Sequence, residues 1–284
     1  GDRFDIVFDR STGQITTWQA EGRPVVESGP RFNLWRAPTD NDAKRMEALW
    51  REAGLDTLEE TATEVSVTRL EPQAVRVTVV STTSVPGISG EYRTTIYGSG
   101  DVVLEYRVAV AETLPPLPRV GIAMTLPQER RVLTWYGRGP HENYVDRNQG
   151  AALGVYKANV DALIVPYIMP QEYGNRTDVR WAALRDNEGW GLLVAGMETF
   201  EVSAHPYAIS DLDAVKHTYE LELADRVYLY VDLAQSGLGS ASCGPGVLPK
   251  YELTASAYRA CIRMRPLAAG DDPGMLSKAQ FPCP

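Results

Sequence analysis

Four short polar clusters stand out in this 284-residue chain as places where chemistry could occur. They are residues 31–42 (RFNLWRAPTDND), 135–150 (WYGRGPHENYVDRNQG), 166–181 (PYIMPQEYGNRTDVRW) and 237–245 (GLGSASCGP). The first three place guanidinium, carboxylate and amide groups beside aromatic rings. Such planar donors and acceptors match sugar hydroxyls, and aromatic rings match sugar faces, so one interpretation is a carbohydrate site. The other is that arginine–carboxylate pairs and Asx turns brace long loops. Composition alone does not separate the two.

The histidines give no sign of a catalytic or metal centre. His141, His205 and His217 stand at no spacing typical of metal ligands. The sequence also lacks a glycine-rich phosphate loop, an HExxH pair and a nucleophile elbow. We therefore expect each histidine to be a surface or structural residue, and we expect this chain to bind no metal or cofactor.

Charge and cysteine content narrow the classes of partner. The formal net charge is −9, and without a basic stripe this argues against nucleic acid and anionic membranes as partners. No apolar run approaches the roughly 18 residues that span a bilayer. Cys243, Cys261 and Cys283 form an odd set without metal-type spacing, which favours neither a disulfide framework nor a zinc knuckle. We expect a reducing, cytoplasmic setting.

Alternation of apolar residues dominates the chain and predicts half-buried antiparallel strands. The clearest stretches are residues 4–8, 75–79, 227–233 and 258–264. Turn sequences at residues 98–101 (GSGD) and 186–189 (DNEG) predict two hairpins. Many strands with turns between them and almost no helix favour an all-β fold, a large β-sandwich.

One stretch departs from the alternation. Met46, Leu49 and Trp50 recur at helical spacing, an Asn or Asp precedes them as a cap, and Gly54 follows as a stop. This predicts one short helix over residues 43–53. The proline-containing residues 113–119 (TLPPLPR) are the best candidate for a crossing between halves of the sandwich. We expect residues 1–267 to form the domain and residues 268–284 to be an irregular tail over the surface.

The motifs RAPTDND, WYGRGPHENYVDR, PYIMPQEYGNRTDVRW and GLGSASCGP, in this order, resemble the C-terminal domain of the large bacterial β-galactosidases of glycoside hydrolase family 2. The resemblance extends from the opening strands to about Pro266. It implies a large antiparallel super-sandwich, related to galactose mutarotases, that closes one side of an active site. The chemistry of that site lies in a preceding (β/α)8 barrel.

The resemblance also assigns roles to two loops. Residues Gly139, Pro140, His141, Glu142 and Asn143 match the family's mobile loop beside the active-site mouth. Gly139 would be a hinge, because glycine tolerates positive φ and has no side chain, and Glu142 would hold one loop position by hydrogen bonding. The alternative is that His141, Asn143 and Tyr144 simply pack the turn.

The second loop contains a departure from the family pattern. Cys243 stands where some relatives have a tryptophan that stacks on the aglycone sugar, the glucose of lactose, and Ser242 would add a hydroxyl. A thiol offers a small polarizable contact instead of a stacking face, so the aglycone subsite should be wider and weaker. The alternative is that Cys243 is a buried small residue beneath the loop.

By the same resemblance, this chain contains no catalytic residue. Retaining glycoside hydrolysis needs two carboxyl groups about 5–5.5 Å apart, and both glutamates of the family belong to the barrel, as do its Mg²⁺ and its Na⁺ or K⁺. We therefore expect the isolated chain to be inactive. Its partners would be the barrel domain of the same β-galactosidase, a β-galactoside such as lactose, and further copies in a homo-oligomer.

Two other functions stay open at this point. A free-standing mutarotase or epimerase would bind a sugar in the concave face and move a proton with a histidine and a glutamate; His141, His205 and Glu172 would be its candidates. A carbohydrate-binding module would bind a glycan without chemistry. The match of the loop motifs to β-galactosidase argues against the mutarotase.

Overall fold

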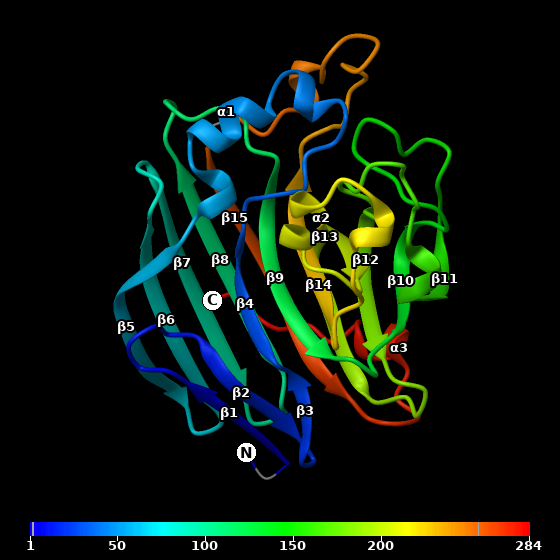
Figure 1. The fold of residues 1–284 in the computed structure, drawn as a ribbon. Helices are drawn as coiled ribbons and strands as arrows, with labels where there is room; N and C mark the ends of the chain where they lie inside the picture. Colours follow the sequence, from blue (N-terminus) through cyan, green and yellow to red (C-terminus); the bar gives the residue numbers. More distant parts are fainter. Residues whose placement is uncertain (2, 255) are drawn as a thin grey trace.

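Fifteen strands and a few short helices make up the computed structural model, which describes residues 1, 3–254 and 256–284 (Figure 1). The strands are β1 (Phe4–Phe8), β2 (Ile15–Ala20), β3 (Arg23–Val26), β4 (Ser28–Asn33), β5 (Glu60–Glu71), β6 (Ala74–Thr83), β7 (Ile88–Tyr97), β8 (Val102–Val110), β9 (Arg119–Pro127), β10 (Val132–Gly139), β11 (Ala152–Asn159), β12 (Arg176–Arg185), β13 (Gly191–His205), β14 (Arg226–Gln235) and β15 (Ala257–Leu267). The α-helices are α1 (Glu47–Glu52), α2 (Ile209–Ala214) and α3 (Pro273–Leu276), and the 3-10 helices are η1 (Asp42–Lys44), η2 (Leu55–Thr57), η3 (Val160–Leu163), η4 (Thr218–Glu220) and η5 (Pro249–Tyr251).

The predicted alternation produces strands with one buried face. In β14, Val227, Leu229 and Val231 are at most 1% exposed, whereas Tyr228 between them is half-buried. Successive side chains of a strand point to opposite faces, so the three apolar residues lie together on the core side. The expected all-β, antiparallel class is confirmed, because every strand pairing in the described residues is antiparallel.

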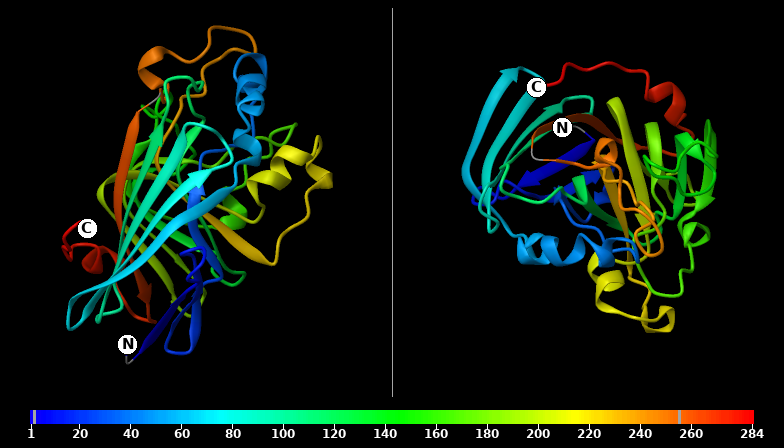
Figure 2. Two further views of the ribbon diagram at one scale, coloured as in Figure 1. Left: turned by 90° about the vertical axis from the view of Figure 1, so that its left-hand side faces the viewer. Right: turned by 90° about the horizontal axis from the view of Figure 1, so that it is seen from above.

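One large curled sheet forms both layers of the sandwich. Its main path runs β11-β10-β12-β13-β15-β8-β7-β6-β5, while β14, β9 and β4 branch from β13. The branch arises because β13 changes partner: residues 191–196 pair with β15, and residues 201–205 pair with β14. Seen from above in Figure 2, the sheet curls so that β5–β7 and β10–β12 lie on opposite sides. Strands β1–β3 form a separate small sheet.

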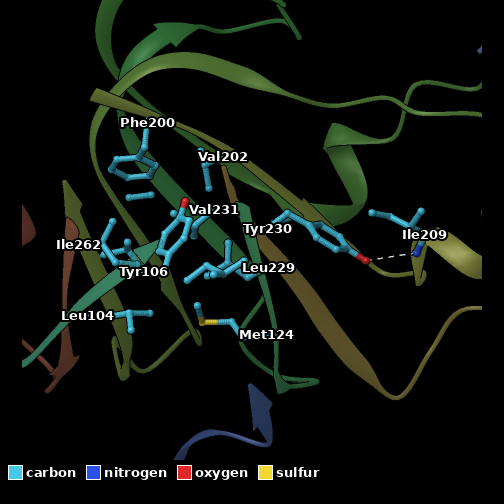
Figure 3. Close-up of a cluster of buried hydrophobic side chains, with 14 of the residues drawn as sticks. Leu104, Tyr106, Met124, Phe200, Val202, Ile209, Leu229, Tyr230, Val231 and Ile262 are labelled. Atoms are coloured by element: carbon cyan, nitrogen blue, oxygen red, sulfur yellow. Dashed lines mark hydrogen bonds between the residues drawn. The ribbon is translucent and has the colours of Figure 1, made fainter. Parts of the chain in front are cut away.

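The core fills the space between β8, β9, β13, β14 and β15. Figure 3 shows its side chains meeting there: Leu104, Tyr106, Met124, Phe200, Val202, Leu229, Val231 and Ile262. All of them are at most 4% exposed. Burying each of the larger apolar side chains contributes roughly 1.5–3 kcal/mol. The fold is therefore stabilised mainly by this contact between layers. The loops at the strand ends are not part of it.

Both predicted hairpins and the predicted crossing are confirmed. Residues 98–101 connect β7 to β8, and residues 186–190 connect β12 to β13, each pair of strands being antiparallel. Residues 111–118, which contain most of the TLPPLPR stretch, connect β8 to β9. Since β8 pairs with β7 and β15 whereas β9 pairs with β14 and β4, the chain crosses to the other branch here.

The predicted helix is present but shorter and capped differently. Within residues 43–53, η1 ends at Lys44 and α1 occupies Glu47–Glu52, and neither has a side-chain cap. Asp42 accepts bonds from Thr39 and Arg36 instead of capping the helix. Gly54 ends the segment as expected, with φ of +77°. Helices α2 and α3 were not predicted from the sequence.

The cysteine interpretation is wrong for two of the three residues. Cys261 on β15 forms a disulfide with Cys283, 22 residues later, and Cys243 is free and exposed. Residues 268–284 are further held where Phe281 packs on Tyr97 and where α3 covers the Trp181 region. The odd number of cysteines gave no reason to expect this pair. The spacing of cysteines in the sequence also does not show which strand the C-terminal tail crosses. Among the described residues, no helix is both long and apolar enough to cross a bilayer.

Candidate functional site

The four polar clusters of the sequence come together at one end of the molecule. We call residues 35–42, 139–151, 164–176 and 236–247 the loop cluster; in Figure 1 they lie in the upper part, where blue, green and orange segments gather. Backbone hydrogen bonds join them, from Glu172 N to Ala37 O (3.0 Å) and from Asn143 N to Asn175 O (2.8 Å). Segments more than 100 residues apart in sequence thus build one surface.

Glu142 is the hub of the 139–151 loop. Its Oε2 accepts a hydrogen bond from the backbone of Gly174 at 2.7 Å. Its Oε1 receives the hydroxyl of Tyr167 and the guanidinium of Arg147. The Glu142 side chain is 11% exposed, and its bonds to Gly174 and Tyr167 join the 139–151 loop to residues 164–176. The structure thus provides hydrogen bonds of the kind expected for Glu142.

Asn143 is wholly buried and fixes the base of the same loop. Its Oδ1 accepts from the backbone and the hydroxyl of Thr177, at 2.9 and 2.6 Å, and its Nδ2 donates to His141 O at 3.0 Å. Tyr144 is equally buried, under the guanidinium of Arg147. Asn143 and Tyr144 therefore pack the turn, as the alternative interpretation held, whereas the side chain of His141 is exposed.

Gly139 is a glycine for a different reason from the one expected. Its φ lies outside the left-handed region, since it is absent from the positive-φ residues of the chain. A Cβ here would come within 2.8 Å of the Tyr156 ring and 3.0 Å of Trp135. Close packing, not positive φ, requires glycine at this position. The Gly139–Pro140 peptide bond that follows is cis.

The loop with Ser242 and Cys243 is attached to the other segments mainly through its backbone. Gly239 N donates to Asp146 Oδ2 at 2.8 Å, and Gly239 O accepts from Asn41 Nδ2 at 2.9 Å. Asn41 Oδ1 in turn accepts from the backbone and the hydroxyl of Ser242, at 2.9 and 2.7 Å. Cys243 is exposed, so the alternative that it is buried beneath the loop is wrong.

Asp146 and Arg36 are the connecting residues that sequence reasoning missed. Asp146 links the 139–151 loop to Gly239. Arg36, fully buried, forms a two-pronged ion pair with Asp42 and also donates to the backbone oxygens of Ser236 and Gly237. Both residues lie within the quoted motifs, but their partners other than Asp42 are 93 to 201 residues away, and no local pattern reveals those contacts.

The acid–base groups proposed for a mutarotase are not brought together. His205 is buried on β13 between Tyr173 and Tyr230, and burial together with Arg119 and Arg176 lowers its pKa to about 3. Glu172 is buried in an ion pair with Arg119. No hydrogen bond of the described residues joins His141, His205 and Glu172 to one another, so they form no proton-transfer group here.

Three carboxylates of the loop cluster are held in ion pairs with arginines. Asp42 binds Arg36, Glu142 binds Arg147, and Glu172 binds Arg119. Across residues 1, 3–254 and 256–284 no group of three or more His, Cys, Asp or Glu is arranged to hold a metal ion. The surface can thus offer hydrogen bonds, an exposed thiol and loop shape to a ligand.

Comparison with known proteins gives a consistent picture. The family model "Beta galactosidase small chain" matches residues 1–264. The β-galactosidases of Priestia megaterium and Vibrio cholerae are 37% and 36% identical over 94% and 91% of this chain, each aligned over 26% of its own length. The chain thus spans about a quarter of these curated relatives. A putative aldose 1-epimerase from Escherichia coli K12 is similar over 93% of this chain and 96% of its own, at 9% identity and a TM-score of 0.45; a likeness of that degree carries no functional information.

Proposed function

The chain belongs to the β-galactosidase small-chain family, and we propose that it completes one side of the active site of a β-galactosidase without supplying the catalytic groups. The parent reaction would be the retaining hydrolysis of terminal β-D-galactosides such as lactose. That reaction needs two carboxyl groups about 5–5.5 Å apart, one as acid/base and one as nucleophile. In this proposal both belong to the other three-quarters of the enzyme.

The observation that carries the proposal is the convergence of the four motif segments in the loop cluster. Three of their carboxylates, Asp42, Glu142 and Glu172, are held in ion pairs with arginines. What the loop cluster offers a substrate is shape: two loops side by side, joined by the bond between Asp146 and Gly239. This suits a rim that positions a sugar next to catalytic groups located elsewhere.

We assign the two loops different parts of that rim. The 139–151 loop would be the mobile side of the mouth, with Gly139, Pro140, His141, Glu142 and Asn143 determining its position. The loop with Ser242 and Cys243 would face the aglycone, because its backbone is anchored while the Cys243 side chain stays exposed. With a thiol in place of an aromatic ring, this subsite would hold the leaving sugar weakly.

A segment exchange tests the proposal. In the Priestia megaterium β-galactosidase, the aligned quarter would be replaced by this chain, and hydrolysis of a chromogenic β-galactoside would be measured. We expect the chimera to be active and both the isolated chain and the truncated relative to be inactive. A folded but inactive chimera, or turnover by the isolated chain that survives removal of host enzymes, would overturn the proposal.

A further inference from the structure

A cluster of charged residues is buried beneath the loop cluster, where β9, β12, β13 and β14 meet. Arg119 on β9 lies 3.5 Å from Glu172 and 2.5 Å from Asp232 on β14. Arg176 begins β12 and is 3% exposed, and the other three are buried at least as deeply. Among the described residues, Arg119 is the one guanidinium that forms ion pairs with Glu172 and Asp232, so these two carboxylates share one cation.

Glu201 adds a third carboxyl group to this cluster without a second ion-paired cation. It lies on β13 directly opposite Asp232 in the strand register and is 7% exposed. Within the part of the chain that the structure describes, no arginine, lysine or histidine forms an ion pair with it; its side-chain partner is the Nδ2 of Asn175. A buried carboxylate beside another carboxylate is costly, so this geometry favours the neutral acid.

Asn175 connects Glu201 to the 139–151 loop. The same Nδ2 that donates to Glu201 also donates to the backbone oxygen of Asn143 at 3.2 Å, and Asn175 O accepts from Asn143 N at 2.8 Å. Asn143 then holds Thr177 through its Oδ1. All of these residues are at most 7% exposed. A continuous chain of buried contacts therefore runs from Glu201 to the base of the loop.

We propose that Glu201 is a positioning residue for the 139–151 loop: as a neutral acid it fixes Asn175, and Asn175 fixes Asn143. When Glu201 loses its proton, the new charge faces Asp232 across the strand pair, and Arg119 is already shared by two carboxylates. Separating the charges or hydrating them requires the ends of β12 and β13 to open. The loop is then less firmly held. Only the role of this loop at a substrate rests on the proposed function. The coupling between the Glu201 proton and the position of the loop is a property of the chain itself.

Burial is the main cause that raises the pKa of Glu201, to about 8, and the Asp232 carboxylate adds to it; Asn175, Gln235 and Arg119 act in the opposite direction. The folded-state pKa is thus above the ordinary value of 4.5. The stability from the bound proton is complete below pH 4.5 and is lost as pH rises through 8. His205 has its pKa lowered to about 3, so its contribution to the free energy of unfolding rises with pH between 3 and 6.5, opposite in sign to that of Glu201. Above pH 6.5, His205 no longer changes the free energy of unfolding with pH, so the dependence that remains there from these two residues is that of Glu201.

Hydrogen exchange on the complete chain tests the inference with the variant Glu201→Gln. The probes are the backbone amides of Asn143 and Thr177, which are hydrogen-bonded at the loop base. Glutamine keeps the carbonyl acceptor for Asn175 and cannot ionise. At pH 6.5 the two proteins should protect these amides equally. At pH 9, one unit above the Glu201 pKa, the variant should protect them up to about tenfold better.

Glu60→Gln is the matched control. Glu60, on β5, is likewise a largely buried acid whose pKa burial raises, and it accepts bonds from Ser81 and Tyr92. It lies at the opposite end of the sheet path from β10 and β12. This variant should leave the two loop amides like those of the wild type at both pH values.

Three results would overturn the inference: equal protection of wild type and Glu201→Gln at pH 9, the same gain in Glu60→Gln, or failure of Glu201→Gln to fold. The last counts because a neutral acid should tolerate its neutral isostere. The exchange measurement needs no catalysis. An inactive chimera would therefore leave this inference untouched, and a failed exchange result would leave the proposed function untouched.

Discussion

The two loops that carry the predicted site residues are held in opposite ways. In the 139–151 loop the side chains make the contacts: Asn143 and Tyr144 are wholly buried, and Glu142 binds three groups. In the loop with Ser242 and Cys243 the backbone makes most of them, through Gly239 and its neighbours, and both of those side chains are exposed. The two loops nevertheless lie side by side.

This difference separates residues that set loop shape from residues that can meet a ligand. Changing a side chain of the 139–151 loop should alter the fold of the loop itself. Changing Ser242 or Cys243 should leave the fold intact and alter only what the surface presents. The exposed Cys243 position should therefore accept a larger side chain.

The largest effect is expected for Asn143→Ala. The change leaves the backbone amide and the hydroxyl of Thr177 buried without their acceptor, and each such group costs roughly 1–3 kcal/mol. We expect a loss of about 4 kcal/mol in the free energy of unfolding, measured by chemical denaturation. Asn148→Ala changes a side chain on the same loop that forms no hydrogen bond with the described residues; it is the control and should cost little. Similar losses in both would contradict side-chain anchoring of this loop.

A slightly smaller loss is expected from Cys283→Ser, far from both loops. A disulfide closing a loop of about 20 residues typically contributes about 3 kcal/mol, and this one links Cys261 to the tail. Thermal melting with and without reductant should show the loss in the wild type only. The amides of the loop cluster should keep their relative protection. Selective opening of either loop would show that the tail, and not only local contacts, holds the loops.

Glu142→Gln should have a moderate effect. Glutamine can still accept from Gly174, but it loses the charge facing Arg147. Since Arg147 is about half exposed, solvent screens this pair and the expected loss is about 1 kcal/mol. Hydrogen exchange of residues 141–147 should rise while the core strands stay unchanged. An unchanged loop would mean that the ion pair contributes nothing to its position.

Ser242→Ala should change stability by less than about 0.5 kcal/mol. The hydroxyl binds Asn41 Oδ1 at the surface, and the backbone amide of the same residue still occupies that oxygen. Denaturation curves of the variant and the wild type should overlap. A loss as large as that of Glu142→Gln would show that this loop, too, depends on its side chains.

Sequence reasoning reached the strands and the hairpins, because alternation and turn residues are local signals; the loops of the candidate site were assigned from the family resemblance. It could not reach contacts that depend on distant partners. Asp146 shows no sign of Gly239, which is 93 residues away, and the tail gives no sign that Cys283 meets Cys261. Gly139 was expected to be a hinge that uses the freedom of glycine to adopt positive φ, whereas its φ is not positive and close packing against Tyr156 requires a glycine there. Glu201 lay in an ordinary strand pattern, and only the register opposite Asp232 reveals its environment.

The most direct test of the central claim, that the loop with Cys243 borders the aglycone of a β-galactosidase substrate, is Cys243→Trp in the active chimera. Inhibition constants for glucose and for a galactose analogue would be measured together with the melting temperature. Because Cys243 is exposed, we expect an almost unchanged melt. A stacked ring contributes about 1 kcal/mol, so glucose should bind roughly five-fold tighter while the galactose analogue is unaffected. An unchanged glucose constant, or equal tightening of both ligands, would contradict the claim.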